Sequence, residues 1–496
     1  MSRIKLGRIV WLTLVLALAW FLRPWWHGLV MTLVISPLSL IFVLLLAFGV
    51  YSLIKRIGPF QVVKLAPASY SLKSSNKIST RWIVAYLGVL AVVFIGLFLQ
   101  NEIRYTLAAK KIDYIKRAEL PEFSPIRLTP KPVATRYAED SFQNPQEHLG
   151  DSQIVLDQGR LVRVSPRLPD GGLLYLVNKM NGFVTVQVDT LERKVNIYDQ
   201  KFKYSEGVGV FDNIYFRLPL KRYFATYSSE PTYLRNDSGE WVTVVPYMTY
   251  KGFPFRIPEW GGVMVVSADG TINDYTPAEA ESISYLKGNR IYPKELALYY
   301  ADSYAYNGGI LNKWFLHRNQ TEIVSLPSDE SVIHSATAEG FKQVIVAEPY
   351  GRSYGIFKVF VFDATTGKRE IVEFDQNSQL TGPIAAADYI KREFPTYDWS
   401  GFSLSEPRPV KVAGDLNWLL SIIPNDSAGI AKTVLLNAKT NKVVGVDNEA
   451  QLQALLAGTP ALPADTTAPT DKNSDIRSKI DSIQKALDEL RSLVSQ

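Results

Sequence analysis

Apolar residues concentrate in three stretches near the start of the 496-residue chain, at residues 9–22, 29–54 and 82–99. The second stretch runs for 26 residues and the third for 18 without a charged side chain. A helix rises about 1.5 Å per residue, and a hydrocarbon core is about 30 Å thick, so both stretches are adequate to cross a membrane. The pattern therefore predicts two transmembrane helices, over 29–54 and 82–99.

The first stretch, 9–22, is short for a membrane span. Its sequence also resembles a secretory signal peptide, because MSRIKLGR precedes the apolar run and ALA stands at 17–19. We favour a span or half-span, since WFL at 20–22 and a second apolar run would follow the cleavage site at once. Trp25 and Trp26 are then expected at the membrane interface, with the Arg23 side chain extending toward water.

Beyond these stretches the pattern changes to short runs of Val, Ile, Tyr, Phe and Thr, broken by Gly, Asp and Asn. Four segments combine an alternating strand, a polar turn and a second strand, which predicts β-hairpins. They are 184–198, 263–275, 358–374 and 433–446. Helical patterns follow three of them. We therefore expect an α+β fold of serial modules, with one domain over 151–340 and a second over 341–456.

Residues 102–150 connect the apolar stretches to the strand-rich region. Apolar positions at helical spacing over 103–119 predict a juxtamembrane helix that serves as a spacer. Four prolines between 120 and 145 predict an extended, irregular linker.

Charge is distributed unevenly and fixes the expected topology. Residues 1–101 form the predicted membrane anchor and contain ten Lys or Arg and no acidic residue, so the rest of this +6 chain sums to −4. Because the net positive charge is confined to the first 101 residues, the remaining chain is not basic, which argues against nucleic-acid binding. The 55–81 loop carries six positive charges, Lys55, Arg56 and Arg81 among them, and is expected in the cytoplasm, although such a loop could also bind anionic lipids.

This topology makes the chain an integral protein of the plasma or inner membrane with residues 102–496 on the extracytoplasmic side. The chain contains no cysteine. An exported domain of this size from a eukaryotic secretory pathway would usually carry disulfides, so their absence favours a prokaryotic, archaeal or phage source.

The hairpins at 358–374 and 433–446 share a Val- or Leu-rich strand, a turn of the form DATTGK or NAKTNK, and a second strand. In this they resemble the hairpins of PepSY-type modules, found in exported and membrane-anchored bacterial proteins. The resemblance covers about 20 residues each time and implies small α+β modules for regulation or interaction. It implies no catalytic residue.

A linker and a coiled coil are expected at the end of the chain. Residues 457–474 are rich in Pro and small polar residues, which predicts a flexible linker. Residues 475–496 place an apolar residue at every seam position of three heptads, which predicts a helix that associates with its own copies or a partner helix, rather than folding back on its own domain. The seam residues are Ile476, Ile480, Ile483, Leu487, Leu490 and Val494.

The sequence contains no complete catalytic or metal-binding motif. GRSYG at 351–355 has the spacing of a nucleophile elbow around Ser353, but strand patterns flank it on both sides, where an elbow needs a following helix. The chain lacks a zinc-protease motif, a complete calcium loop and a phosphate-binding loop, so we expect no metal, cofactor or catalytic residue. A pair of catalytic carboxylates, as in glycosidases, has no fixed spacing in the sequence, so the sequence does not exclude such a pair.

Together these features predict a membrane-anchored, oligomeric envelope or surface scaffold or binding protein, either independent or an accessory subunit of a larger complex. Its expected partners are the lipid bilayer, a second copy or partner helix, and an envelope protein or glycan. Aromatic residues between 215 and 260 could stack on sugars, although such residues more often fill a sheet core. The alternative is an exported, carboxylate-dependent hydrolase or glycan-processing enzyme.

Overall fold

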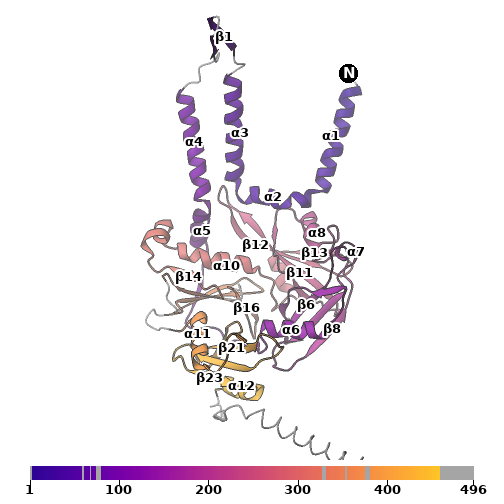
Figure 1. Ribbon diagram of the computed structural model, residues 1–496, viewed down its shortest axis with the longest axis vertical. Helices are drawn as coiled ribbons and strands as arrows, with labels where there is room; N and C mark the ends of the chain where they lie inside the picture. The colour runs from indigo at the N-terminus through magenta and orange to yellow at the C-terminus, as the bar shows by residue number, and fades with distance from the viewer. Residues whose placement is uncertain are drawn as a thin grey trace, which may run out of the picture.

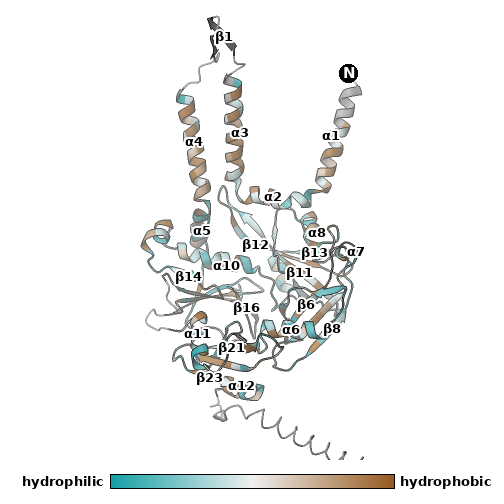
Figure 2. Cartoon of the chain, viewed as in Figure 1, coloured by the Kyte–Doolittle hydropathy of each residue, from teal (hydrophilic) through white to brown (hydrophobic). Residues whose placement is uncertain are grey.

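The computed structural model describes residues 3–57, 61–66, 69–73, 80–326, 331–351, 355–374 and 380–458. Its fold is mixed α+β, as predicted, with a strand-rich body and several long helices on one side of it (Figure 1). The long helices α1 (Arg3–Phe21), α3 (Pro37–Ile57) and α4 (Thr80–Phe98) all project from that side. Figure 2 shows hydrophobic residues along most of α3 and α4.

One helix segment, Arg81–Phe98, is long and apolar enough on its own to cross a membrane, and it corresponds to the predicted span over 82–99. The predicted span over 29–54 is interrupted. Residues 29–35 belong to α2 (Arg23–Ile35), and the apolar part of α3 covers Pro37–Ser52. A sharp bend of 81° separates α2 from the end of α1.

The break in the second stretch lies at Ser36, which adopts a non-helical conformation with φ −120° and ψ 72°. Pro37 excludes the helical conformation at the preceding residue and has no backbone N–H to donate, so the helix ends there and a new one begins. The second stretch is apolar as predicted, but the single span expected over 29–54 is divided, because α2 turns across the body and contacts α8 (Ile214–Lys221).

Helices α3 and α4 pack side by side, joined at their far end through β1 (Gln61–Ala66) and β2 (Ser69–Lys73). The Tyr86 hydroxyl donates to the Leu45 carbonyl at 2.7 Å, and Phe42 contacts Phe94 with ring centroids 6.0 Å apart. Gly49 lies directly under the Tyr86 ring, where any side chain would overlap it.

The predicted spacer and linker are parts of the folded body. Helix α5 (Gln100–Lys111) continues from α4 and stacks Tyr105 on Tyr299 and Tyr306, at centroid distances of 4.8 and 5.3 Å. Strand β3 (Ile115–Arg117) joins a sheet of the body, and α6 (Lys131–Ser141) follows. The proline-rich segment is extended but packed, because its apolar residues Leu120, Phe123 and Leu128 are buried between modules.

The body is built from four antiparallel sheets, which we call modules 1 to 4. Module 1 comprises β4 (Glu147–Leu149), β5 (Gln153–Asp157), β6 (Arg160–Pro169), β7 (Gly182–Gln187) and β8 (Val195–Asp199). Module 2 comprises β9 (Thr226–Tyr227), β10 (Thr232–Arg235), β11 (Trp241–Lys251), β12 (Ile257–Val266) and β13 (Ile272–Tyr275).

Modules 3 and 4 each consist of five strands, as modules 1 and 2 do. Module 3 comprises β14 (Thr321–Ile323), β15 (Ile333–Thr337), β16 (Gly340–Pro349), β17 (Lys358–Asp363) and β18 (Arg369–Glu373). Module 4 comprises β19 (Phe402–Leu404), β20 (Arg408–Val412), β21 (Asp415–Pro424), β22 (Lys432–Asn437) and β23 (Val443–Val446). The expected domain boundary between 340 and 341 falls at the start of β16.

All four modules share one topology. Two short strands pair with opposite halves of the first long strand, and two successive hairpins complete the sheet. In module 1, for example, β5 pairs with residues 160–164 of β6 and β4 pairs with residues 167–169. The last hairpin of each module is one of the four predicted hairpins, which are thereby confirmed. Strand β3 adds to module 3 in parallel with β18.

A helix precedes each module and packs on its sheet. Helices α6, α8, α10 (Lys294–Ser303) and α11 (Pro383–Glu393) bury apolar side chains against modules 1, 2, 3 and 4 respectively. Shorter elements complete the body: α7 (Leu174–Val177), α9 (Pro277–Ser282), η1 (Tyr304–Tyr306), η2 (Asn312–Leu316) and α12 (Glu449–Leu456). Helix α12 lies at the end of the body opposite α3 and α4 (Figure 1).

Candidate functional site

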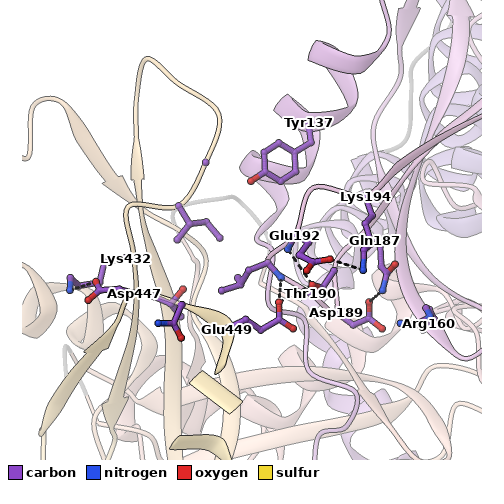
Figure 3. A pocket seen from close by; sticks show the side chains of 15 residues that line it. Tyr137, Arg160, Gln187, Asp189, Thr190, Glu192, Lys194, Lys432, Asp447 and Glu449 are labelled. Carbon is purple, nitrogen blue, oxygen red and sulfur yellow. Dashed lines mark hydrogen bonds and ion pairs between the residues drawn. The ribbon is translucent and has the colours of Figure 1, made fainter. Parts of the chain in front are cut away.

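A cleft of about 730 Å³ lies between module 1 and module 4. Module 1 contributes the β7–β8 turn and the start of β6, and α6 contributes Tyr137. Module 4 contributes the loop before β22, the start of β22 and the beginning of α12. Figure 3 shows these side chains around the opening, labelled as Tyr137, Arg160, Gln187, Asp189, Thr190, Glu192, Lys194, Lys432, Asp447 and Glu449.

Glu449 joins the two sides of the cleft. Its carboxylate accepts one hydrogen bond from the Thr190 hydroxyl and one from the Leu191 backbone N–H, both at 2.8 Å. The side chain is placed by the first turn of α12, because Asn448 caps that helix and accepts from the Gln451 backbone N–H at 2.9 Å. Modules 1 and 4 are therefore held together at one edge of the cleft by charge-assisted hydrogen bonds.

The other carboxylates of the cleft also have partners. Asp447 pairs with Lys432 at 2.5 Å, and Asp189 accepts from the Gln187 amide at 2.7 Å. Glu192 pairs with Lys194 at 2.7 Å, and this hydrogen bond and charge lower the pKa of the Glu192 carboxyl. The cleft thus presents carboxylates, basic side chains and amides. This set suits hydrogen bonding to a polar ligand better than general acid catalysis.

A carboxylate with a raised pKa lies elsewhere, on module 3. Glu348 on β16 faces Glu322 on β14 in directly paired positions. Burial, together with the like charge of Glu322, raises the pKa of Glu348 to about 7. One oxygen of Glu348 is enclosed and accepts no hydrogen bond within the described part of the chain.

The structure places the predicted interface residues in two groups. Trp25 and Trp26 lie on α2 and are 58% and 55% exposed, whereas Lys55, Arg56 and Arg81 lie at the ends of α3 and α4 far from the body. Arg23, predicted to extend toward water, is half-buried against the body. Its guanidinium lies 4.3 Å from the centroid of the Trp20 ring and donates to the Leu220 carbonyl at 3.2 Å, so it fastens α2 to the body.

His27 makes a contact with the body that the sequence pattern did not predict. One ring nitrogen lies 3.0 Å from the Ala225 carbonyl oxygen, and the ring meets Tyr223 edge-on at 5.4 Å. A histidine inside an apolar run was the available signal, but its partner is 198 residues away in the chain.

Ser353 and the six predicted seam residues lie outside the described residues. Within the described ranges, no group of three or more His, Asp or Glu side chains is arranged to hold a metal ion.

Comparisons with known proteins give no family. No protein-family model matches the chain, and no curated protein matches it. Among solved structures, the chain is similar to a putative glycoside hydrolase from Parabacteroides distasonis, at 10% identity and a TM-score of 0.19 over 67% of this chain and 83% of that one. It is also similar to an ACO/RPE65 chimera, at 11% identity and a TM-score of 0.17 over 61% and 62% of the two chains. Both TM-scores are too low to indicate a shared fold.

Proposed function

We propose that the chain is a membrane-anchored scaffold or binding protein whose modular body lies on the extracytoplasmic side and receives a polar partner in the cleft between modules 1 and 4. One observation carries the proposal. The apolar helices α1, α3 and α4 leave the body on one side, whereas α12, which forms part of the cleft, lies at the opposite end (Figure 1). A membrane around the helices would leave the cleft open to the envelope.

Charge supports this orientation. The far ends of α3 and α4 and the residues between them carry all six positive charges of the 55–81 segment, and positively charged loops face the cytoplasm. Helix α4 would then cross outward, and the body after Phe98 would be extracytoplasmic. The packed junction of α4, α5 and module 3 supports a body held at a fixed position above the membrane, rather than one attached through a flexible linker.

Self-association through Ile476, Ile480, Ile483, Leu487, Leu490 and Val494 is part of the proposal. The described chain ends two residues after α12, beside the cleft, so a coiled coil that follows would bring several clefts together. The resemblance of two hairpins to PepSY-type modules fits an interaction role. The resemblance is supported by the positions of the two hairpins, because β17–β18 and β22–β23 are the last hairpins of modules 3 and 4.

The orientation can be tested by labelling cysteine variants in intact cells of the host that expresses the chain. Because the chain has no native cysteine, Lys439→Cys in module 4 and Lys73→Cys between α3 and α4 each provide a single thiol. We expect a membrane-impermeant maleimide to label the first in intact cells and the second only after permeabilisation. The reverse result would contradict the proposal.

The assembly can be tested separately from the native mass of the full chain in mild detergent, with and without residues 475–496. We expect a trimer or larger species that the truncation converts to monomer, because Ile at both seam positions favours more than two strands. Monomers in both cases would remove self-association from the proposal and would turn attention to glycan binding and hydrolysis by the body.

A further inference from the structure

Exposed apolar side chains gather on the side of the body from which the long helices leave. Leu173 and Val177, in and beside α7, are 76% and 78% exposed. Phe224, just after α8, is 62% exposed, and Phe253, in the β11–β12 turn, is 72% exposed. Helices α7, α8 and α2 and the turn before β12 all lie toward the long helices in Figure 1.

A chain of contacts links the segments near α7 and α8 to α2. The segment that contains Phe211 lies beside α7, because a Cβ on Gly209 would stand 3.2 Å from the Leu176 Cα. The Arg217 guanidinium of α8 donates to the Phe211 carbonyl at 2.6 Å. The Tyr223 hydroxyl, beyond α8, then donates to the Arg23 carbonyl of α2 at 3.0 Å.

The β11–β12 turn is fixed to the end of the apolar helix α4. Arg104 on α5 donates to the Arg256 carbonyl in that turn at 2.6 Å. Arg104 stands six residues beyond Phe98, the last residue of the segment able to cross a membrane, which corresponds to about 9 Å along a helix. The Arg256 end of the turn that contains Phe253 is therefore held close to the level at which α4 would leave the hydrocarbon core.

We propose that this docking face, comprising Trp25, Trp26, Leu173, Val177, Phe224 and Phe253, inserts into the outer surface of the bilayer that α4 enters. The inference rests on the proposed membrane anchoring and extends it from the helices to the body. Aromatic side chains are enriched at the level of lipid headgroups, and an apolar surface of this kind is buried there by the hydrophobic effect.

A bilayer is the occupant that the geometry favours over a protein partner. Helix α2 lies at the base of α1 and α3, with α8 next to it, so a membrane that holds those helices would meet this side of the body first (Figure 1). Helix α2, fastened to the body through Arg23 and His27, presents Trp25 and Trp26 at the same level. Docking would attach the body to the membrane over a broad face, in addition to the α4–α5 connection.

The test uses the full chain in phosphatidylcholine nanodiscs, with one nitroxide label at a time. The docking variants are Val177→Cys, Phe224→Cys and Phe253→Cys. Val92→Cys, whose native side chain is 70% exposed on α4, reports on the anchor, and Lys439→Cys reports on the far side of the body. The readout is relaxation of each label by oxygen, which concentrates in lipid, against relaxation by a nickel chelate, which stays in water.

We expect the three docking labels and the Val92 label to respond more to oxygen than to the nickel chelate, and the Lys439 label to do the reverse. If the Val92 label is in lipid while the docking labels behave like the Lys439 label, docking is wrong and the anchor stands. A Val92 label in water would overturn the proposed anchoring as well. Docking labels shielded from both reagents would indicate a second copy on this face and would also overturn the inference. Leu173→Cys substitutes for any variant that does not fold.

Discussion

The Glu406 carboxylate lies 3.2 Å from the guanidinium of Arg127, and both side chains are only 8% exposed. The same carboxylate accepts from the Lys131 backbone N–H at 3.0 Å. Arg408, two residues away, donates to the carbonyls of Arg127 and Leu128 at 2.9 and 2.6 Å. These contacts lock the proline-rich segment, which the sequence suggested to be a linker, into module 4.

Burial and charge act in opposite directions within this network. The pKa of Arg408 is lowered to about 9, mainly by burial, with Glu406 opposing the shift and Arg127 and Arg163 adding to it. Burial alone would raise the pKa of Glu406, but Arg127, Arg408 and Arg163 outweigh it and lower that pKa. Glu406 is therefore the anion on which the buried arginines depend.

Replacing Glu406 with Gln should destabilise the body strongly. The change keeps the shape of the side chain but leaves buried arginines without their counter-charge, which typically costs about 3 to 5 kcal/mol of unfolding free energy. Urea unfolding followed by tryptophan fluorescence would measure it. Glu119→Gln is the matched control, because Glu119 pairs with Lys411 at 2.6 Å but is 74% exposed. Equal urea midpoints for the two variants would refute a structural role for the buried pair.

Stability should depend on pH through Glu348. Its folded pKa of about 7 lies above the ordinary value of 4.5, so the folded protein binds this proton more tightly than the unfolded chain does. The stabilisation from the protonated group is complete below about pH 4.5 and is lost as the pH rises to about 7. Glu348→Gln should therefore raise the melting temperature more at pH 8 than at pH 4.

Glu322→Gln provides a second measurement of the same pair. Burial would still raise the pKa of Glu348 after this change, but the like charge would be gone. The loss of stability with rising pH should then become smaller without disappearing. A pH dependence unchanged by either substitution would show that the Glu322 and Glu348 carboxyls do not interact.

The contact between α3 and α4 should be sensitive to a single methyl group. Gly49→Ala places a Cβ into the Tyr86 ring, so the helices must separate or Tyr86 must release the Leu45 carbonyl. Gly88→Ala on α4 is the control, because its Cβ would meet open space. We expect the first variant to lower the temperature of heat-induced aggregation in detergent and the second to leave it unchanged or raise it, since Ala favours helix over Gly by about 1 kcal/mol.

The two sides of the cleft should separate when Glu449 is removed. Glu449→Ala leaves the Leu191 N–H and the Thr190 hydroxyl without their acceptor, at a cost of about 1 to 3 kcal/mol. Hydrogen exchange at the Leu191 amide should accelerate accordingly. Glu192→Ala, which removes a carboxylate paired only within module 1, should not accelerate it.

Local sequence was sufficient for the parts of the fold that depend on neighbours in the chain. Each of the four hairpins has alternating side chains on both strands and an Asp, Gly or Asn turn, so its register follows from residues less than 20 apart. The short outer strands were not predicted. Strand β4, for example, has only three residues and pairs with β6 at a distance of about 20 residues in the chain, as Glu147 with Pro169.

Long-range contacts explain the remaining differences. The α2 helix lies across the body because Arg23 and His27 find partners near residues 220–225, and no local pattern reports that. The cleft joins α6, the β7–β8 turn and the start of α12, segments about 300 residues apart. Trp25 and Trp26 were singled out from their place next to an apolar run, and the structure exposes both side chains on α2.

Strand β3 gives the junction between α5 and module 3 a particular resistance to pulling. It begins four residues after α5 and pairs in parallel with β18, through Ile115–Arg117 and Glu370–Val372. Tension applied between α4 and the far end of the body would enter module 3 along this strand and load its hydrogen bonds together, in shear, instead of opening them one after another. The exposed ion pairs of Lys116 with Glu373 and Arg117 with Glu370 cross the same junction. The attachment of α4 and α5 to the body is thus built as a mechanical clamp.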